Sequence, residues 1–589
     1  MKIRLHQVLN GASCVGALSA AFSLGLAQPA MANSANPGSA SVSSLLAGAS
    51  VGQSTVDGST IQAQITAAIT AGQTSLILPP SKILVSQSLL IPAHANNFSL
   101  IGQVGTEIQR TGTADFPLLT IGRGRNYAFD NASFVSQAQT SVEPIAEGAR
   151  WITRTGGEQV RPGWYAIVGV HPVDDIVLHP DGVTKFAFKR ELVKVLRVEG
   201  ERVYLAEPVA REYATPELRF MDDDSTHQWF STVAENITVR NIKFIGRSAT
   251  NNVWTNKLIV AFATVNLRIE NIELTGFNNA GISSMFNKGI YISGLRTSDG
   301  NTNSLGYGVE FAACRNITVR NSQFSGHRWG TLFQSGTTDA LVEDCSYAPG
   351  PNGGFDGGHG QDERRITFRR CIGPTWSIAN PAYLRGVKNV TLEDCTAYGT
   401  INVSANAENV RIKGKYPGQA NTMRLLQLST EGSTTTVPSG SFPPKSVYLE
   451  NGSSVGSDLD GVTVLMHTLT GQPLGIGLLD VRNWTFRNTL SSVGSAVKFN
   501  STSTPSTLRF TNVVFENNYL YNSPLWLGPV SGTGFWNITF QNCQLSTRWR
   551  YGVNFANNSR GTVTANETFI NGTLFNSGHI NNLTATGAQ

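Results

Sequence analysis

Residues 355–365, FDGGHGQDERR, gather the side chains of this chain that are best suited to chemistry. A histidine, three acids and two arginines lie around three glycines, and glycine permits the close approach of a ligand. Asp356 would orient the imidazole of His359 and favour its charged form, an arrangement typical of a general acid or base. Arg364 and Arg365 are suited to hold a carboxylate through paired donors. The segment therefore predicts proton transfer beside a bound carboxylate.

A repeat of short alternating strands must position this segment. The phrases RNITVRNSQFSG, DALVEDCSYAPG, RRITFRRCIGPT and KNVTLEDCTAYG follow one another, and aligning Asn316, Ala340, Arg365 and Asn389 gives intervals of 24, 25 and 24 residues. This period is too short for a helical pair and fits one coil of a parallel β-solenoid. The cysteines that close three of these strands are expected to stack inside as a ladder, namely Cys345, Cys371 and Cys395.

The register of the repeat extends the candidate site into neighbouring coils. Stepping back six residues from each anchor predicts a surface column about 4.8 Å apart per coil, made of Glu310, Gln334, His359 and Tyr383. Stepping back four residues adds Gln361 and Arg385. One coil before the histidine, the HRWG segment adds His327 and Arg328, and it adds Trp329 as a platform for stacking a sugar. Asp362 and Arg365 complete the predicted substrate contacts.

Each of these residues also has a purely structural interpretation. His359 could be a histidine of an ordinary turn, and Arg364 and Arg365 could be charges of an edge strand. Trp329 could belong to the core, while Asp362 and its neighbour Glu363 are expected to face solvent. The spacing of histidines and cysteines predicts no zinc site.

The rest of the chain divides by composition. Residues 1–32 have a basic start, an apolar run and a small-residue end, which predicts a signal peptide cleaved after Ala32; a membrane anchor is the alternative. Residues 33–57 are expected to form a flexible leader. Residues 58–149 predict first coils behind a capping helix with Ile61, Ile65, Ala68 and Ile69 on one face and Gly72 as its stop. Hairpin-like alternation predicts a β-rich insertion at 150–225, coils at 226–580 and a tail at 581–589.

Charge and cysteine content exclude several classes of protein. The net charge of +5 is mild and no basic block stands out, so nucleic acid is not implied. After the signal peptide no stretch reaches the roughly 18 apolar residues of a membrane span, so no membrane partner is expected. Five cysteines would remain after the loss of Cys14, too few for a disulfide framework. Asn236, Asn266, Asn316, Asn389, Asn483 and Asn537 recur at one point of the repeat, where left-handed, stacked asparagines are expected.

These features resemble the right-handed parallel β-helix of the pectate-lyase-like superfamily. The resemblance rests on the helix followed by LPPS, the Asn-led coils of about 25 residues and the inward aliphatic alternation, and it covers most of residues 58–580. It implies an all-β solenoid with an N-terminal capping helix and a small β insertion. The superfamily includes polysaccharide lyases, glycoside hydrolases, uronan epimerases and phage depolymerases, so the resemblance implies a carbohydrate chain bound along the stacked strands.

Two short motifs resemble catalytic elements of that superfamily. Residues 355–359, FDGGH, are similar to the Asp-Pro-His segment of alginate C5-epimerases, with one extra residue and glycine in place of proline, which implies Asp356 and His359 as the acid/base group. Residues 358–360, GHG, resemble the Gly-His-Gly element of polygalacturonase-type hydrolases. The paired carboxylates of that type are missing from the preceding coils, where the chain has GVE at 308–310 and RWG at 328–330.

The resulting hypothesis is a secreted polysaccharide lyase that cleaves an acidic polysaccharide by β-elimination. Arg364, Arg365 and Arg385 would neutralise the uronate carboxylate, and His359 would move the proton. A glycoside hydrolase that pairs Asp356 with Asp362 or Glu310, a uronan epimerase and a non-catalytic carbohydrate-binding solenoid are the alternatives. The sequence demands no cofactor, leaves a role for Ca²⁺ open, and leaves the oligomeric state open.

Overall fold

Short strands with alternating side chains make up most of the protein. In a computed structural model of the 589-residue chain, residues 54–581 are described apart from 123–138, 141–142, 155–159, 171–175, 179–184, 188–189, 215, 222–231, 248–255, 303–304, 349–352, 380–384, 417–424, 429–441, 457–463, 467–474, 489–494, 500–501, 503, 519–522 and 548–550. The predicted signal peptide, nearly all of the leader, Tyr383 and all but the first residue of the tail lie outside the described residues. Within those described, no helix has the length and hydropathy of a membrane span.

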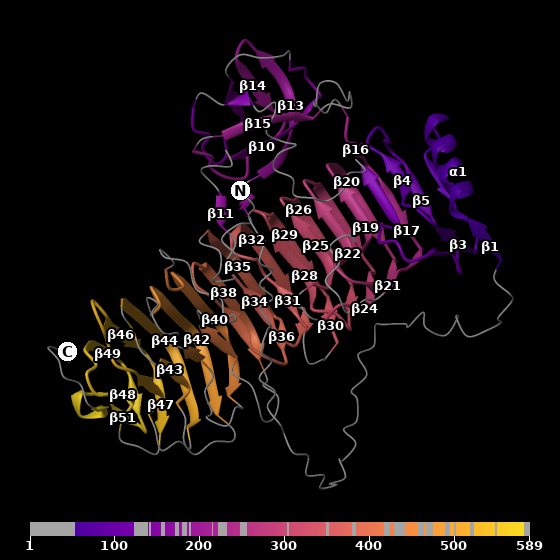
Figure 1. Cartoon of the computed structure of the whole chain (residues 1–589). Coiled ribbons are helices and arrows are strands. Elements are labelled where there is room, and N and C mark those ends of the chain that lie inside the picture. Colours follow the sequence, from indigo (N-terminus) through magenta and orange to yellow (C-terminus); the bar gives the residue numbers. More distant parts are fainter. Residues whose placement is uncertain are drawn as a thin grey trace, which may run out of the picture. The chain divides into compact units, whose positions relative to one another are not determined.

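The coils up to β36 (Thr396–Ala397) visit three parallel sheets, which we call C, B and A in chain order, whereas the described strands of most later coils belong to two sheets only (Figure 1). Sheet C consists of β4 (Leu89–Pro92), β7 (Leu119–Gly122), β19 (Lys257–Phe262), β22 (Ala280–Met285), β25 (Tyr307–Ala312) and β28 (Trp329–Gln334). Its place in later coils is taken by sheet D, with β31 (Phe355–Asp356), β34 (Trp376–Ile378), β37 (Ile401–Val403), β39 (Leu426–Leu428), β41 (Val464–Met466), β43 (Val497–Phe499), β45 (Leu525–Leu527), β48 (Val553–Phe555) and β52 (Ile580–Asn581).

Sheets B and A complete the coils. Sheet B contains β2 (Ser75–Ile77), β5 (Ser99–Ile101), β16 (Ala234–Glu235), β17 (Thr238–Arg240), β20 (Thr264–Glu270), β23 (Lys288–Ser293), β26 (Arg315–Arg320), β29 (Thr338–Glu343), β32 (Gln361–Arg369), β35 (Gly386–Glu393), β38 (Glu408–Tyr416), β40 (Ser446–Gly456), β42 (Leu478–Asn488), β44 (Pro505–Asn518), β46 (Phe535–Gln541), β47 (Gln544–Thr547), β49 (Gly561–Asn566), β50 (Phe569–Ile570) and β51 (Thr573–Leu574). Sheet A contains β1 (Thr55–Asp57), β3 (Lys82–Val85), β6 (Glu107–Arg110), β18 (Lys243–Ile245), β21 (Glu273–Phe277), β24 (Arg296–Gly300), β27 (Gln323–Phe324), β30 (Ser346–Tyr347), β33 (Ile372–Gly373) and β36 (Thr396–Ala397). A short 3₁₀ helix, η2 (Ser577–His579), precedes β52.

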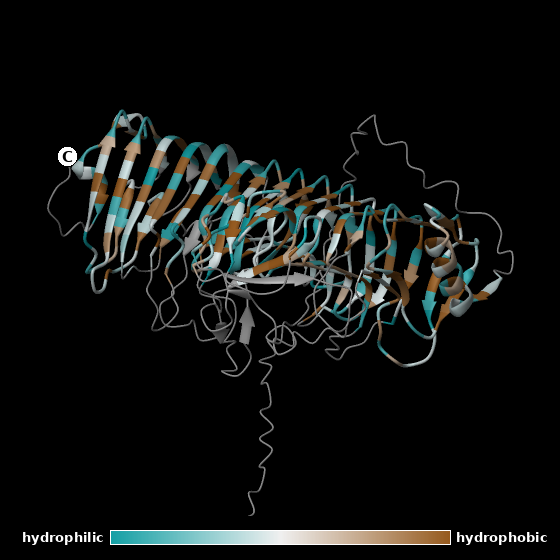
Figure 2. Ribbon diagram, turned by 90° about the horizontal axis from the view of Figure 1, so that it is seen from above, coloured by the Kyte–Doolittle hydropathy of each residue, from teal (hydrophilic) through white to brown (hydrophobic). Residues whose placement is uncertain are grey.

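Hydrophobic and hydrophilic residues alternate along the strands (Figure 2), and the hydrophobic side chains are buried inside the tube. In β26, for example, Ile317 and Val319 are buried in a continuous core that runs from the first coils to the last. Burial of this apolar surface supplies the main favourable free energy of folding. The predicted all-β parallel solenoid is therefore confirmed.

The corners of the coils explain the recurring asparagines. Left-handed backbone occurs at Asn236, Asn266, Asn316, Asn389 and Asn483, with φ between 52° and 58°. Successive side chains stack through amide hydrogen bonds; Asn266 Nδ2 donates to Asn236 Oδ1 at 2.9 Å. Asparagine tolerates this backbone because its short amide can bond locally. Two asparagines depart from the prediction. Asn483 lies in a different ladder, bonded to Asn451 and Asn512, and Asn537, which is paired with Thr507 at the register of the others, is not left-handed.

The strand register corrects one repeat anchor and confirms the cysteine ladder. Ile317, Ala340 and Ile366 are paired across β26, β29 and β32. Asp339, with φ of 60°, therefore takes the corner position of Asn316, and Ala340 lies one residue later. Cys345, Cys371 and Cys395 follow equivalent strand ends in consecutive coils, and all three are buried free thiols.

Helix α1 (Gly58–Thr70) closes the first coil as predicted. Asp57 caps its start by accepting a hydrogen bond from Ser59 N at 2.7 Å. Ile61, Ile65 and Ala68 are buried in the main core. Gly72, with φ of 68°, ends the helix in the left-handed conformation that glycine adopts without strain.

An antiparallel insertion enters between β7 of sheet C and β16 of sheet B. Its six strands pair in the order β8 (Gln139–Thr140), β15 (Pro216–Met221), β10 (Tyr165–Val170), β13 (Arg190–Glu199), β14 (Arg202–Leu205) and β9 (Trp151–Thr153), with a separate hairpin of β11 (Ile176–Leu178) and β12 (Lys185–Ala187). Tyr165, Ile167 and Leu192 pack on Phe262, Met285 and Ala312 of sheet C. The predicted β insertion is thus present and lies against the corner between sheets C and B.

Candidate functional site

The predicted catalytic segment lies where sheet C gives way to sheet D. Only a few backbone bonds cross this break, among them Gly330 N to Gly354 O at 2.7 Å and His359 N to Phe333 O at 2.9 Å. Gly358 has φ of 137°, and a Cβ there would lie 2.8 Å from both γ carbons of Val387. Glycine is therefore required for the bend that presents His359 at the edge of the coil.

His359 and Asp356 form the pair that the sequence predicts. The imidazole Nδ1 lies 3.3 Å from Asp356 Oδ2, and the histidine side chain is 16% exposed while the aspartate side chain is 4% exposed. The other carboxylate oxygen accepts a hydrogen bond from Gly358 N at 2.7 Å. When Nδ1 donates its hydrogen to Asp356, the lone pair resides on Nε2, which makes that atom a base.

Gln334 is the neighbour of His359 in the preceding coil. It follows the buried Phe333, whose carbonyl accepts from His359 N, so it lies on the outer side of sheet C. Its Nε2 donates to Glu310 Oε1 at 2.7 Å. Glu310 itself is paired with Leu332 rather than with Gln334. The predicted column is therefore staggered by two residues. One arises because the connection between β28 and β29 has one residue more than the connection between β25 and β26, and the other because the anchor Ala340 lies one residue after the position of Asn316.

Two residues that the sequence analysis did not select hold Glu310 in place. Its Oε2 accepts from Ser283 Oγ at 2.6 Å and from Lys257 Nζ at 2.9 Å. Lys257 also donates to Ser283 at 2.9 Å, and all three side chains are buried. The signals in the sequence are Lys257 at the start of the apolar strand KLIVAF and the serine pair Ser283 and Ser284 within AGISSM.

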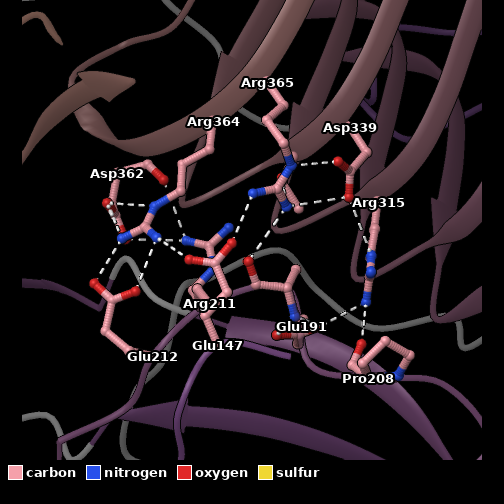
Figure 3. Close-up of polar contacts among 12 residues, drawn as sticks. Glu147, Glu191, Pro208, Arg211, Glu212, Arg315, Asp339, Asp362, Arg364 and Arg365 are labelled. Carbon is pink, nitrogen blue, oxygen red and sulfur yellow. Dashed lines mark hydrogen bonds and ion pairs between the residues drawn. The ribbon is translucent and has the colours of Figure 1, made fainter. Parts of the chain in front are cut away.

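Arg364 has protein carboxylates as partners. Its guanidinium donates to both oxygens of Glu212, at 2.8 and 2.9 Å, and contacts Asp362 at 3.0 Å and Glu147 at 3.2 Å (Figure 3). Burial acts to lower the pKa of Arg364, but the hydrogen bonds and charges of Glu212 and Asp362 outweigh it and raise the pKa overall. Arg364, which was predicted to bind a uronate, is therefore already paired with two carboxylates of the insertion, Glu147 and Glu212, and with Asp362 of its own strand.

The expectation that Asp362 and Glu363 face solvent was wrong. Asp362 is buried between Arg364 and the fully buried Arg211, whose Nη1 lies 3.3 Å from Asp362 Oδ2. A polymer at the surface does not reach a carboxylate in this position, so Asp362 is a structural ion-pair partner. Glu363 is also buried and accepts hydrogen bonds from Gly360 N and Gln361 N at 2.9 and 2.8 Å.

Arg365 and its neighbours extend the contact between insertion and solenoid. Arg365 Nε donates to Asp339 at 2.6 Å, and Nη1 contacts Glu147 at 3.0 Å. Arg315 joins Asp339 to Glu191, at 3.2 Å from each. We call the whole set the insertion clamp; it comprises Glu147, Glu191, Arg211, Glu212, Arg315, Asp339, Asp362, Arg364 and Arg365 (Figure 3).

His327 was wrongly predicted to contact substrate, because it lies inside the tube with no exposed surface. Its Nε2 lies 2.7 Å from Thr297 Oγ1, and its ring is 5.3 Å from those of Phe277 and Tyr347, centroid to centroid. Burial lowers the pKa of His327 to about 3. Trp329, by contrast, is only half-buried and packs against Tyr307 and Leu332. The Arg328 guanidinium lies 5.8 Å from the centroid of the Trp329 ring.

Acid should destabilise the protein through His327. Between its ordinary pKa of 6.5 and the folded value of about 3, the unfolded chain binds a proton that the folded chain does not. The contribution of His327 to the free energy of unfolding should therefore fall by about 1.4 kcal/mol per pH unit as the pH drops through this window. The variant His327→Phe should lose less stability over the same range, as measured by melting temperatures from pH 7 to 4. The exposed His94→Phe serves as control, and equal pH dependence of His327→Phe and wild type would contradict the assignment.

Two solved structures have a fold similar to that of this protein. The tailspike protein gp49 from Pseudomonas phage LKA1 matches with a TM-score of 0.56 and 13% identity, over 80% of this chain and 76% of that chain. The Pseudomonas phage phi297 tailspike gp61 matches with a TM-score of 0.54 and 13% identity, over 79% and 75%. The fold is a parallel β-helix, as in these two tailspike proteins. At this identity the likeness concerns the fold of the β-helix alone.

A further tailspike has a weaker similarity to the β-helix. The gp54 tailspike of Acinetobacter baumannii bacteriophage AP22, in complex with A. baumannii capsular saccharide, matches with a TM-score of 0.48 and 11% identity, over 88% of this chain and 73% of that chain. No protein-family model and no curated protein matches the sequence. Among the described residues of the β-helix, no group of three or more His, Cys, Asp or Glu side chains is arranged to hold a metal ion.

Deprotonation of Glu363 should destabilise the β-helix as the pH rises through neutrality. Burial raises the pKa of Glu363 from 4.5 to about 8, although backbone hydrogen bonds oppose this shift. Between these values the unfolded chain has released a proton that the folded chain retains, so the contribution of Glu363 to the free energy of unfolding should fall as the pH rises, by about 1.4 kcal/mol per unit. Glu363→Gln keeps an oxygen for the Gly360 and Gln361 amides and should flatten this decline between pH 5 and 8. Melting temperatures of this variant and of the exposed control Glu273→Gln test it; a decline unchanged in Glu363→Gln would refute the shift.

Proposed function

We propose that this protein cleaves a polysaccharide on the outer side of the β-helix, where sheet C meets sheet D. The observation that carries the proposal is the His359–Asp356 pair, with Nδ1 3.3 Å from a carboxylate that is itself held by Gly358 N. The imidazole is partly exposed at a break in the ladder, beside Gln334, so a chain laid along the strands can approach it. A fixed histidine with a defined basic nitrogen is suited to move a proton.

β-Elimination on a uronate is the reaction that we favour. Nε2 of His359 removes the proton from C5 of the sugar, the C5 electron pair forms the C4–C5 double bond, and the bond between C4 and the glycosidic oxygen breaks. The leaving oxygen takes this proton from the imidazolium, directly or through one water molecule, which returns the histidine to its starting state. Asp356 orients the ring and stabilises the imidazolium between these steps.

In this proposal Arg385 neutralises the substrate carboxylate, while Arg364 and Arg365 belong to the insertion clamp. Arg385 is exposed, and the next residue, Gly386, donates its N–H to the Gly360 carbonyl at 3.0 Å. The backbones that carry His359 and Arg385 are therefore adjacent in successive coils. A guanidinium can hold a carboxylate in bidentate fashion.

A glycoside hydrolase is the second candidate. The buried carboxylate of Glu310 lies on the outer side of sheet C, bonded to Ser283, Lys257 and Gln334. With Asp362 enclosed by arginines, Glu310 and Asp356 are the pair left for acid and base roles. Epimerisation shares the first step of the elimination, and a binding solenoid would need no proton transfer.

Product chemistry separates these functions. The mature protein is incubated with alginate, polygalacturonate and bacterial exopolysaccharides. Absorbance from a 4,5-unsaturated uronate supports the lyase, and new reducing ends without this absorbance support the hydrolase. Inverted uronate residues in an intact polymer indicate the epimerase. Retention of the polymer with no chemical change would reject cleavage and leave a binding protein.

Export is part of the proposal, since the sequence predicts cleavage after Ala32. Expression with the native N-terminus in a secreting bacterial host should release a protein that begins at Asn33. Mass spectrometry of the intact secreted protein reads this terminus directly. A product that retains residues 1–32 and sediments with membranes would favour the anchor instead.

A further inference from the structure

A pocket of about 240 Å³ lies between the insertion and the β-helix. One wall comes from β10, β13 and the residues after β14, and the other from the starts of sheet B strands in four coils, with Glu235, Asn266, Lys288 and Asn316. These coils all precede the coil of His359, and they present sheet B rather than sheet C to the pocket. The pocket is therefore separate from the proposed cleavage site.

The floor and rim of this pocket differ in character. Tyr165 and Leu192 are each 3% exposed, and with the half-buried Val265 they form an apolar floor. The rim carries charged and amide side chains. An apolar surface beneath a polar rim complements a sugar ring, whose C–H face is apolar and whose hydroxyls point outward.

The charges of the rim cancel in pairs. Lys194 Nζ lies 3.2 Å from Glu235, and Lys288 Nζ lies 2.5 Å from Glu207. The Tyr165 hydroxyl also donates to Glu235, and burial together with this carboxylate raises the pKa of Tyr165. A charged ligand would have to compete with a paired side chain of its own sign. Neutral hydroxyls can donate to the carboxylates and accept from the ammonium groups without separating them.

We infer that this pocket binds one uncharged sugar residue, and that it is a second carbohydrate site of the protein. Its volume is below the roughly 300–1,000 Å³ of pockets for drug-sized ligands, which suits a single ring rather than an oligosaccharide. The ring rests on the Tyr165 and Leu192 floor, and its hydroxyls contact Glu235 and Lys288. Binding here does not depend on cleavage at His359.

Saturation-transfer difference NMR on the mature protein tests this site with D-glucose, D-galactose and N-acetyl-D-glucosamine as probes and D-glucuronate as the charged comparison. At least one neutral sugar should bind, about tenfold more tightly than glucuronate. Ala206→Trp, which fills the pocket from its half-exposed rim, should abolish the signal. Thr391→Trp, on the outer face of sheet B, should preserve it, and so should His359→Ala, which separates this site from the cleavage site.

A second variant keeps the shape of the pocket and changes its charge. Glu207→Gln leaves the ammonium of Lys288 without its carboxylate, so the preference should shift towards glucuronate by about fivefold, the upper range for a partly exposed ion pair. The inference is overturned if no neutral sugar binds, if binding survives Ala206→Trp, or if Glu207→Gln leaves the preference unchanged.

Discussion

Replacing His359 by alanine is expected to lower the rate of polysaccharide cleavage by about 10²–10⁴-fold, the usual contribution of a positioned acid or base. The imidazole is partly exposed and contacts Asp356, so its removal leaves the core intact. The melting temperature should therefore remain close to that of the wild type. Initial rates of product formation, by absorbance or reducing ends, measure the effect on whichever polymer the protein cleaves.

Matched variants make this result specific. His94→Ala removes an exposed histidine from the first coils and should leave the rate unchanged. Asp356→Asn should reduce the rate less than His359→Ala, because the base remains but its orientation is no longer imposed by a carboxylate. If His359→Ala retains full turnover, the proposed site is wrong even if the polymer is cleaved.

Replacing Arg364 by methionine is expected to destabilise the attachment of the insertion by about 1.5–3 kcal/mol, the usual contribution of hydrogen bonds to charged groups. The Arg364 side chain is 5% exposed and contacts Glu212, Asp362 and Glu147. Without it, Asp362 stays buried with Arg211 as its remaining cation. Urea unfolding and limited proteolysis should show the insertion opening at lower denaturant concentration.

Arg369→Met is the matched control for this experiment. Arg369 lies on the same strand, β32, and pairs with Glu393 at 2.8 Å, but its side chain is 39% exposed. Solvent screens such a pair, so the loss should stay below about 1 kcal/mol. Equal losses for the two variants would show that the insertion clamp contributes no more than an ordinary surface pair.

Local periodicity predicts most of the fold, since each coil contacts only the coils beside it. The strand pattern around Ile317, the left-handed Asn316 corner and the Cys345–Cys371–Cys395 ladder all follow from spacings of one coil. The same spacing placed His359 beside Gln334. It did not predict the stagger of Glu310, because one extra residue in a single connection and an anchor placed one residue late change which residues are paired.

The sequence by itself determined the parallel solenoid, its capping helix and the nearness of Asp356 to His359, because these depend on residues within one coil of each other. Only the tertiary structure decided the partners of Arg364, which lie 152 and 217 residues away at Glu212 and Glu147. It also decided that His327 points into the tube. The physical reason is that a repeat specifies contacts between neighbouring coils, whereas the contacts of an insertion depend on how two separately patterned surfaces meet.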